Sequence, residues 1–316
     1  MTYDEIDLSA LKTYAGAERA SKVTAVMEAK PPRAGMRLRD FLDRLPDILK
    51  VRELKAVARA VVLAKKSEKP VIVMFGGHVI KTGCSPILAD LAQNGFIHHF
   101  ASNGSAAVHD TELARIGHTS EDVAEQLQDG SFGMAHDTAG FINAAAIRAA
   151  RKRKGLGETL GAMLVEENAP YRDRALLARC HQLKIPYTLH VALGTDIVHQ
   201  HPSADGAAIG ESSLRDFRIL AGTVKRLGQG GVVLNFGSAV IMPEVFLKAL
   251  AVARNLSADV TGFTTANFDM IQHYRPRVNI VERPVLKTGK GYALTGHHEI
   301  MIPLLAATIY EMASDG

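Results

Sequence analysis

The chain has 316 residues, of which 47% are hydrophobic and 22% are charged, and this composition is typical of a globular protein with an ample core. The formal net charge is only +4, and no aromatic residues interleave with the densest basic run, RAARKRK at 148–154, so nucleic-acid binding is not expected. Cys84 and Cys180 lie far apart and form no CxxC pair, which argues against a disulfide framework or a zinc ribbon.

The sequence also lacks the features of a secreted or membrane protein. Its first residues, MTYDEIDLSALKTY, include acids and no apolar core of a signal peptide. No stretch approaches the roughly 18 uninterrupted apolar residues of a transmembrane helix. We therefore expect a soluble, cytoplasmic protein without a membrane partner.

The N-terminal region differs in composition from the rest of the chain. Residues 1–35 are polar and end in KPPRAG, which predicts a surface arm. From Met36 to Lys66 the apolar residues recur at helical spacing, and Pro46 interrupts them. No later segment is rich enough in Pro, Gly or Ser to be a linker. We therefore predict an arm over 1–35 and a single nucleotide-binding-like α/β domain over 36–316.

After Pro70, apolar segments alternate with helical patterns. Such alternation implies a parallel sheet with helices on both faces. The predicted fold is a doubly wound, mainly parallel, Rossmann-like α/β sheet. The predicted strands are 71–75, 96–101, 187–193, 232–236 and 259–265, with a short sixth strand considered at 292–295.

Glycine and small polar residues follow the first two strands. Loops at the carboxyl ends of parallel strands lie beside helix N-termini, where backbone N–H groups and the helix dipole favour phosphates. Neither GxGxxG nor a Walker loop occurs, and a plain strand–helix turn is the alternative explanation. The candidate cofactor contacts are Gly76, Gly77, Lys81, Thr82 and Gly83 after the first strand, and Ser102, Asn103, Gly104 and Ser105 after the second.

Two later positions are candidates for acid–base or substrate-positioning chemistry. His109 and Asp110 lie in the helix after the second loop, either as a general-base pair or as polar residues that the helix dipole favours. Thr195 and Asp196 follow the third strand, where a carboxylate suits a ribose diol or a cationic amine; helix capping is the alternative. We take His109 and Asp196 as catalytic candidates and Thr195 as a further cofactor contact.

Thirteen histidines raise the question of a metal centre. His199 and His201 form an HxH pair close to Asp196, and His297 and His298 are adjacent. HxH alone is a weak signal, and the helical HExxH pattern is absent. We therefore assign no metal ligands. A metal-assisted hydrolase that uses His199 and His201 stays an alternative.

From about Val71 to its C-terminus, the chain resembles the deoxyhypusine synthase family in order and spacing more than in identity. The segment MFGGHVIKTGCS resembles the family's NAD-contacting segment, and SNGSAAVHDTEL resembles its threonine–alanine–glycine–glycine loop with the acidic pair that follows. HVALGTD resembles the strand before the family's threonine–aspartate–glycine turn. FTTANFD and TGHHEIMIPLLAATIYE resemble the strand before the amine-binding loop and the C-terminal segment.

This resemblance implies a Rossmann-like NAD-binding fold of the deoxyhypusine synthase type and an assembly of paired dimers. Members of the family transfer the aminobutyl group of spermidine to a protein lysine, and bacterial relatives act on small amines such as agmatine or putrescine. The resemblance thus implies NAD as the cofactor and a homo-oligomer, either a dimer or a tetramer. The apolar C-terminal helix Leu304–Met312 suits an interface, and core burial explains it equally well.

The chain departs from the family where the amine is bound. The family's catalytic lysine follows a tryptophan–glycine pair, and this chain has no tryptophan. The corresponding stretch, FDMIQHYRPRVNIVERP, places Arg275 and Arg277 where carboxylates would hold a polycation. The family's lysine–histidine–histidine signature is replaced by FGSAVIMPEVF. Deoxyhypusine synthesis is therefore not expected, and Arg275 and Arg277 either bind an acidic substrate or form surface pairs.

These observations give one leading hypothesis. The chain is a divergent, deoxyhypusine synthase-like, NAD-dependent transferase or oxidoreductase that acts on a small polar metabolite, an amine or a related compound. A non-catalytic nucleotide-binding or scaffold protein that kept the fold is the alternative from another class.

Overall fold

The structure, a computed structural model, describes residues 3–256 and 258–314. The chain divides after Val51 into two compact units. In the first unit most side chains are exposed, and the regular elements are the short turns η1 (Gly16–Glu18) and η2 (Ala25–Met27) and the helix α1 (Leu38–Leu42). The predicted break at Pro46 is confirmed, because α1 ends before it and α2 (Leu49–Lys66) begins after it. The N-terminal surface extension expected over 1–35 stays a prediction.

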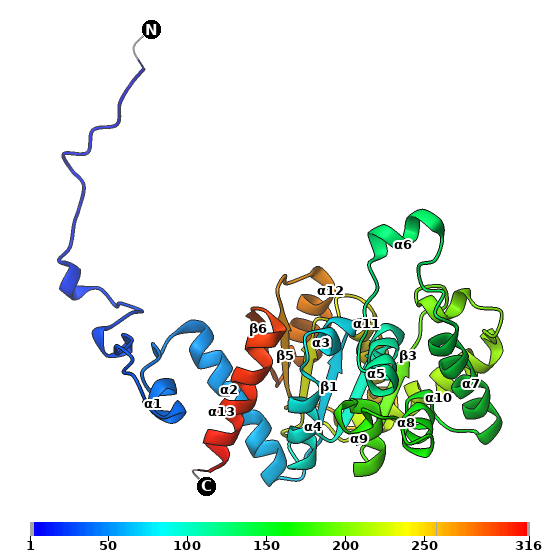
Figure 1. The fold of residues 1–316 in the computed structure, drawn as a ribbon. Helices are drawn as coiled ribbons and strands as arrows, with labels where there is room; N and C mark the ends of the chain where they lie inside the picture. Colours follow the sequence, from blue (N-terminus) through cyan, green and yellow to red (C-terminus); the bar gives the residue numbers. More distant parts are fainter. Residues whose placement is uncertain (1–2, 257, 315–316) are drawn as a thin grey trace. The chain divides into compact units, whose positions relative to one another are not determined.

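The second unit is built on one sheet of six parallel strands in the order β3-β2-β1-β4-β5-β6 (Figure 1). This is the strand order of the dinucleotide-binding α/β fold, with its topological switch point between β1 and β4. All six predicted strands lie in this sheet, so the predicted fold class is confirmed. The strands are β1 (Val71–Phe75), β2 (His99–Asn103), β3 (Tyr187–His190), β4 (Val232–Phe236), β5 (Thr264–Asp269) and β6 (Lys290–Thr295).

Two strands begin later than the sequence predicts. We expected a strand over 96–101, but β2 pairs from His99 opposite Ile72 to Ser102 opposite Phe75. Phe96 is buried before the strand begins, so its hydrophobicity reports burial and not pairing. The strand predicted over 259–265 is likewise β5 from Thr264 to Asp269. Both strands therefore end in polar residues, at the carboxyl edge of the sheet.

Helices cover both faces of the sheet. Val71, Val73 and Phe75 point into one core cluster, whereas Ile72 and Met74 point into the cluster on the other face. The first face carries α2, α3 (Gly77–Lys81), α4 (Ser85–Gln93), α5 (Gly104–Ile116), α7 (His136–Lys152), α8 (Leu156–Glu166), α9 (Leu176–Leu183) and α13 (His298–Ala313); the second carries α10 (Gly206–Val224) and α11 (Ile241–Asn255), with η5 (Arg277–Glu282).

The segments after β1 and β2 are helical turns and not open glycine loops, which corrects the predicted loops. The helix α3 begins at Gly77, two residues after β1, and α5 begins at Gly104, directly after β2. The Asn103 side chain caps α5 by accepting a hydrogen bond from the Ala106 N–H, which satisfies a donor that the helix cannot satisfy internally. The side chains of the first turn of α5 are thereby fixed at the carboxyl edge.

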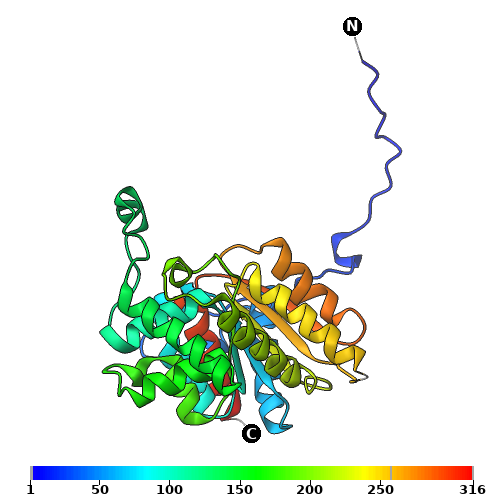
Figure 2. The ribbon, with the colours of Figure 1, turned by 90° about the vertical axis from the view of Figure 1, so that its right-hand side faces the viewer.

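A second segment, residues 118–135, projects from the carboxyl edge (Figure 2). We term this segment, and not the predicted N-terminal extension, the arm from here on. It contains α6 (Val123–Asp129), which Asp122 caps through the N–H groups of Ala124 and Glu125 and which Gly130 ends in the left-handed region.

The C-terminal helix α13 packs into the core. Its buried residues include Ile302, Leu305 and Ile309, all in the core cluster that covers the first face of the sheet. Core burial accounts for the apolar residues that suggested an interface here. Within the described residues, no helix combines the length and the hydropathy that crossing a bilayer requires.

Candidate functional site

A cavity of about 220 Å³ lies at the carboxyl edge, where the segments that follow β1, β2 and β3 meet beneath the arm. The arm contributes Ser120, Glu121, Val123 and Phe132 to its wall. Separate parts of the sequence are therefore brought to one concave site at the carboxyl edge, where ligands bind in parallel sheets, although this cavity lies on the β1–β3 side and not at the switch point between β1 and β4. Five of the predicted site residues line the cavity, namely Lys81, Ser105, His109, Thr195 and Asp196.

His109 is held by a chain of hydrogen bonds that ends at a buried carboxylate. Its Nδ1 lies 2.7 Å from the Thr119 hydroxyl, and that hydroxyl donates to Glu112 Oε2 at 2.5 Å. Because the single Thr119 proton is used on Glu112, the Thr119 oxygen must accept from His109 Nδ1–H. Burial, together with the nearby Lys81, lowers the pKa of His109 to about 4. The imidazole is therefore neutral at pH 7, and its Nε2 is left as a hydrogen-bond acceptor.

Asp110 plays no part in this chain, so the general-base pair that we considered as one of two alternatives is not formed. Its two carboxylate oxygens accept from the N–H groups of Leu176 and Leu177 at 3.0 and 2.7 Å, at the start of α9. Burial raises its pKa to about 6, although these hydrogen bonds lower it. Asp110 is a buried helix cap, and His109 faces the cavity without it.

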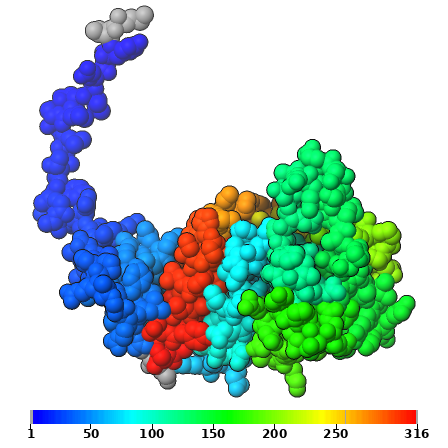
Figure 3. Space-filling model, viewed as in Figure 1, coloured from blue at the N-terminus to red at the C-terminus, as the bar shows by residue number. Residues whose placement is uncertain are grey.

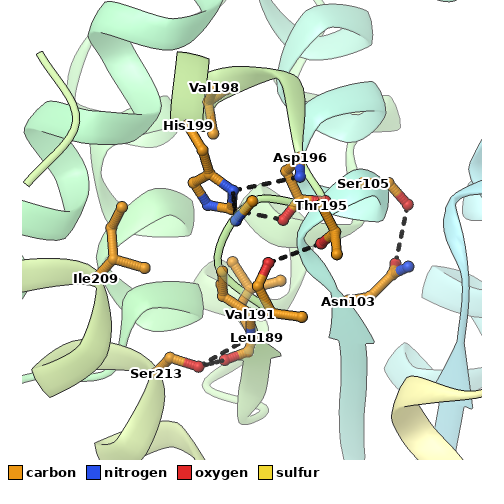
Figure 4. Close-up of polar contacts among 12 residues, drawn as sticks. Asn103, Ser105, Leu189, Val191, Thr195, Asp196, Val198, His199, Ile209 and Ser213 are labelled. Carbon is orange, nitrogen blue, oxygen red and sulfur yellow. Dashed lines mark hydrogen bonds and ion pairs between the residues drawn. The ribbon is translucent and has the colours of Figure 1, made fainter. Parts of the chain in front are cut away.

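The Asp196 carboxylate is buried beside His199 (Figure 4). It accepts from the backbone N–H of His199, and the Asp196 N–H donates to His199 Nδ1, so the two residues form a capping box at the turn η4 (Ile197–Gln200). This is the helix-capping alternative that we considered for Asp196. A methyl group placed on Gly104 would lie 1.9 Å from Asp196 Oδ2, so this carboxylate lies directly against the first residue of α5. His199 Nε2 lies 3.9 Å from Asp196 Oδ2. Burial raises the pKa of Asp196 to about 6. A carboxyl group with this pKa exchanges protons close to neutral pH.

Four further predicted contacts have roles inside the protein. The Ser102 hydroxyl is buried and bonds to the Tyr187 hydroxyl at 2.9 Å, and the Thr82 hydroxyl donates to carbonyl groups of its own helix, α3. Asn103 caps α5 through its side-chain oxygen, which also accepts from Ser105. Gly83 has a φ of +75° and ends the turn after α3, a conformation that favours glycine. These roles explain the residue types without a ligand.

The glycines after β1 permit close packing at the switch point. A methyl group on Gly77 would lie 2.7 Å from the Ser105 hydroxyl oxygen and 3.0 Å from the His109 ring. On Gly76 it would lie 3.3 Å from the carbonyl oxygen of Gly237, at the end of β4. Ser105 and His109 therefore occupy the space that a side chain would need, and the glycines position two cavity residues.

Arg275 and Arg277 do not line the cavity. Arg275 pairs with Glu244 at 3.3 Å and Arg277 with Glu282 at 3.1 Å, and all four side chains are partly exposed. They lie beyond β5, near the other end of the carboxyl edge from the arm (Figure 1). The structure thus shows the surface pairs that we considered as one of the two alternatives.

His199 and His201 serve separate backbone groups. His199 Nδ1 accepts from the N–H groups of Gly194 and Asp196, and His201 Nε2 lies 2.9 Å from the carbonyl oxygen of Gly133. The described residues contain no group of three or more His, Cys, Asp and Glu side chains arranged to hold a metal ion. The HxH pair therefore stabilises the turn after β3 and the base of the arm.

Sequence reasoning missed Glu112, Thr119 and the polar residues beyond β5. His109 and Glu112 are three residues apart in α5 and so share a helix face, a signal that was available in the sequence. Thr119 comes from beyond the end of α5, and no local pattern indicates that it returns to His109. At the other half of the edge, His298 is buried and its Nδ1 has no hydrogen-bond partner among the described residues; burial lowers the pKa of His298, and Asp269 opposes this shift.

The comparisons with known proteins identify no family. No family model matches the chain, and no curated protein matches it. Solved structures do match, and they share the fold of the second unit at low sequence identity. At these identities the similarity shows the fold alone.

Three of these structures illustrate the kinds of protein that share the fold. A ternary complex of AgrE with ornithine and NAD⁺ is 14% identical, with a TM-score of 0.53, over 84% of this chain and 34% of AgrE. A conserved protein of Methanococcus maripaludis S2 assigned to the LOR/SDH group is 16% identical, with a TM-score of 0.53, over 84% of this chain and 71% of that one. A protein of Entamoeba histolytica assigned as a deoxyhypusine synthase is 10% identical, with a TM-score of 0.52, over 88% of this chain and 95% of that protein. This chain therefore spans about a third of AgrE.

Proposed function

We propose that this protein is an NAD-dependent enzyme that acts on a small polar metabolite, an amine or a related compound, in the cavity beneath the arm. The supporting observation is the meeting of His109 and Asp196 at the carboxyl edge, from segments that follow two different strands. Both side chains have strongly perturbed pKa values, which is a common property of active-site groups. The proposal assigns the chemistry to these two residues.

Asp196 is the proposed acid–base group. A general acid or base works best when its pKa is near the operating pH, and the pKa of Asp196, about 6, meets this condition. The neutral His109 is a weaker base, because its pKa is lowered to about 4. Its Nε2 instead accepts a hydrogen bond from a hydroxyl or an amine of the substrate and so orients that group.

The cavity offers part of what NAD requires. Lys81 supplies a cation for a phosphate, and the hydroxyls of Ser105 and Thr195 suit a ribose. The volume of about 220 Å³ is below the roughly 300–1,000 Å³ of complete small-molecule sites, so the cavity holds one part of a dinucleotide or the substrate alone. These three residues would hold that part of the cofactor. When bound, NAD supplies a hydride acceptor, and Asp196 receives or returns the accompanying proton.

The charged side chains that line the cavity support this substrate class. A cation, Lys81, and an acid, Asp196, both line the cavity, so a molecule with an amine and an acidic or hydroxyl group finds complementary partners. AgrE, which shares the fold, was crystallised with ornithine and NAD⁺. The absence of tryptophan from the chain argues against the deoxyhypusine reaction, whose lysine follows that residue in the family.

The test has a binding step and a turnover step. Isothermal titration with NAD should show a site, and a panel of amines, amino acids and hydroxy acids should contain one compound that converts NAD to NADH. Asp196→Asn should abolish turnover, whereas the matched control His136→Ala, at a 90% exposed side chain, should not change it. Binding of NAD without turnover on any compound would favour the non-catalytic alternative. No binding of NAD would overturn the proposal.

A further inference from the structure

The turn η4 separates two cavities. The outer cavity is the one beneath the arm, which stands clear of the neighbouring surface of the second unit (Figure 3). The inner cavity measures about 20 Å³ and lies among α5, α7, α8, β3 and α10. Thr195 and Ile197 line the outer cavity, whereas Val198 and His199 line the inner one. Asp196 lines both cavities, so this residue forms part of the partition between them.

The inner cavity has the size of one water molecule. A cavity can hold a water when its volume exceeds roughly 10–15 Å³ and when polar groups surround it. At about 20 Å³ the inner cavity meets the first condition and is too small for a metabolite. Much of its wall is apolar, from residues such as Leu189 and Ile209 (Figure 4). The polar side chains of its wall are those of Asn143, Asp196 and His199.

Asn143 supplies an acceptor that no other protein group uses. Its Nδ2 donates to the carbonyl oxygen of Val198 and to the Ser203 hydroxyl, both at 3.0 Å. Because the Val198 carbonyl can only accept, the amide cannot be turned round, and Oδ1 is an acceptor. Asn143 is 1% exposed, and its Oδ1 has no hydrogen-bond partner among the described residues. Leaving a buried acceptor unpaired is unfavourable, so a donor is expected in the inner cavity.

His199 supplies a donor to the same cavity. Its Nδ1 accepts from the N–H groups of Gly194 and Asp196, so Nδ1 carries no proton. Burial lowers the pKa of His199, and the neutral ring therefore carries its proton on Nε2. His199 Nε2 lies 3.9 Å from Asp196 Oδ2, which is too far for a direct hydrogen bond. A water molecule can bridge two polar groups at such a separation.

We propose that one water molecule occupies the inner cavity and joins these three side chains. The water oxygen accepts from His199 Nε2–H, and its two hydrogens are donated to Asn143 Oδ1 and Asp196 Oδ2. A carboxylate has about four acceptor sites, and the backbone N–H of His199 fills one of them, so Asp196 has room for the water. About three hydrogen bonds are usual for a buried water. Asn143 and His199 are thereby positioning residues that hold the Asp196 carboxylate through the water.

The water also serves both protonation states of Asp196. The ionised carboxylate accepts from the water, whereas the protonated carboxyl group donates to the second lone pair of the water oxygen. A fixed N–H donor would satisfy the ionised form alone. The presence of the water does not depend on a bound cofactor, but its value for proton exchange at Asp196 rests on the proposed function.

The test displaces the water by filling the inner cavity. Ala146 is buried in α7 and lines this cavity, so the added carbon atoms of Ala146→Val exclude the water. Ala144→Val makes the same change at an exposed position of the same helix and is the matched control. In the wild-type protein and the control, nuclear Overhauser effects should connect a bound water to the methyl groups of Val198 and Ile209. These effects should vanish in Ala146→Val.

A second variant covers the case in which the core does not tolerate valine. Ala146→Ser adds a single hydroxyl group, which takes the place of the water at a smaller cost in packing. The water contacts of Val198 and Ile209 should vanish in this variant as well. The remaining methyl signals of each variant, compared with those of the wild-type protein, show that the chain is folded.

The pKa of Asp196, followed through the ¹³C shift of its carboxyl carbon, gives the second measurement. Loss of the water removes a hydrogen bond that favours the ionised form, so this pKa should rise by about one in Ala146→Val and stay unchanged in Ala144→Val. Both variants keep the other titratable groups that line the two cavities, namely Lys81, His109, Glu112, Glu121 and His199.

Three outcomes would overturn the inference. They are wild-type methyl groups without contact to a bound water, water contacts that persist when Ala146 is replaced, and an unchanged pKa of Asp196 in Ala146→Val. Neither measurement uses NAD or a substrate. A failure of the proposed function, which titration and turnover detect, is therefore distinguishable from a failure of this inference.

Discussion

Buried carboxylates occur in two regions of the second unit, and they differ in what surrounds them. Asp110 and Asp216 lie in the interior and Asp196 lies at the cavity, and burial raises the pKa of all three, to about 6, about 7 and about 6. The interior pair accepts hydrogen bonds from the backbone. Asp196 accepts from the N–H of His199, in the capping box of the short turn η4.

The partners of Asp216 show what an interior carboxylate does. It accepts from the N–H of Gly157, at the start of α8, and from the N–H of Leu189 on the outer edge of β3. A helix end and a strand edge thus receive their missing acceptor from one side chain. A raised pKa is therefore shared by structural and candidate functional groups. The distinguishing observation is the setting of the carboxylate, because Asp196 lines one cavity together with Lys81 and His109.

The largest expected effect comes from removing Asp216, one of the two interior carboxylates. Asp216→Ala leaves the N–H groups of Gly157 and Leu189 buried without an acceptor, and we expect a loss of about 2–5 kcal/mol in the free energy of unfolding, measured with urea. Asp196→Ala, the matched change at the cavity, should cost only about 1 kcal/mol, the usual cost of losing the cap of a helical turn. Equal losses for Asp216→Ala and Asp196→Ala would remove the distinction.

A second effect depends on pH. The folded-state pKa of Asp196, about 6, exceeds the ordinary aspartate value of 3.8, so the folded protein retains this proton to a higher pH than the unfolded chain does. Wild-type stability relative to Asp196→Asn should be highest below pH 3.8 and should fall as the pH rises to 6, by at most about 3 kcal/mol. Urea midpoints of both proteins across this range measure it. A constant difference would contradict the raised pKa.

The sequence predicts the sheet well because apolar runs bounded by turn residues report burial directly. It also indicates Asp196, because the carboxyl end of a parallel strand is where ligand sites form. It does not predict that Asp110 caps α9, since the partner N–H groups are 66 and 67 residues away. Hydrogen bonds over such separations depend on how helices pack, and local patterns carry no signal for them.

A smaller effect is expected from substituting Gly104, the glycine that lies against the Asp196 carboxylate. Gly104→Ala would place a methyl group 1.9 Å from Asp196 Oδ2, so the carboxylate must move; we expect a loss of about 1–3 kcal/mol and weaker ligand binding. Gly140→Ala in α7 is the matched control, because nothing lies within 4 Å of the added methyl group. It should stabilise the protein by roughly 0.5–1 kcal/mol, measured by thermal unfolding. A stable Gly104→Ala protein would show that Asp196 is not held against α5.

The smallest expected effect concerns the link between His109 and Glu112. Thr119→Val keeps the shape of the side chain but removes the hydroxyl that accepts from His109 Nδ1 and donates to Glu112, which still accepts from Thr138. We expect a cost of only about 1 kcal/mol in stability. The ¹⁵N spectrum of His109 should change from the Nδ1–H tautomer to a mixture, and Thr119→Ser should restore it. Because a purely structural hydroxyl would not set the tautomer, an unchanged spectrum in Thr119→Val would show that His109 is not oriented by this chain, and its Nε2 would lose the assigned role of acceptor.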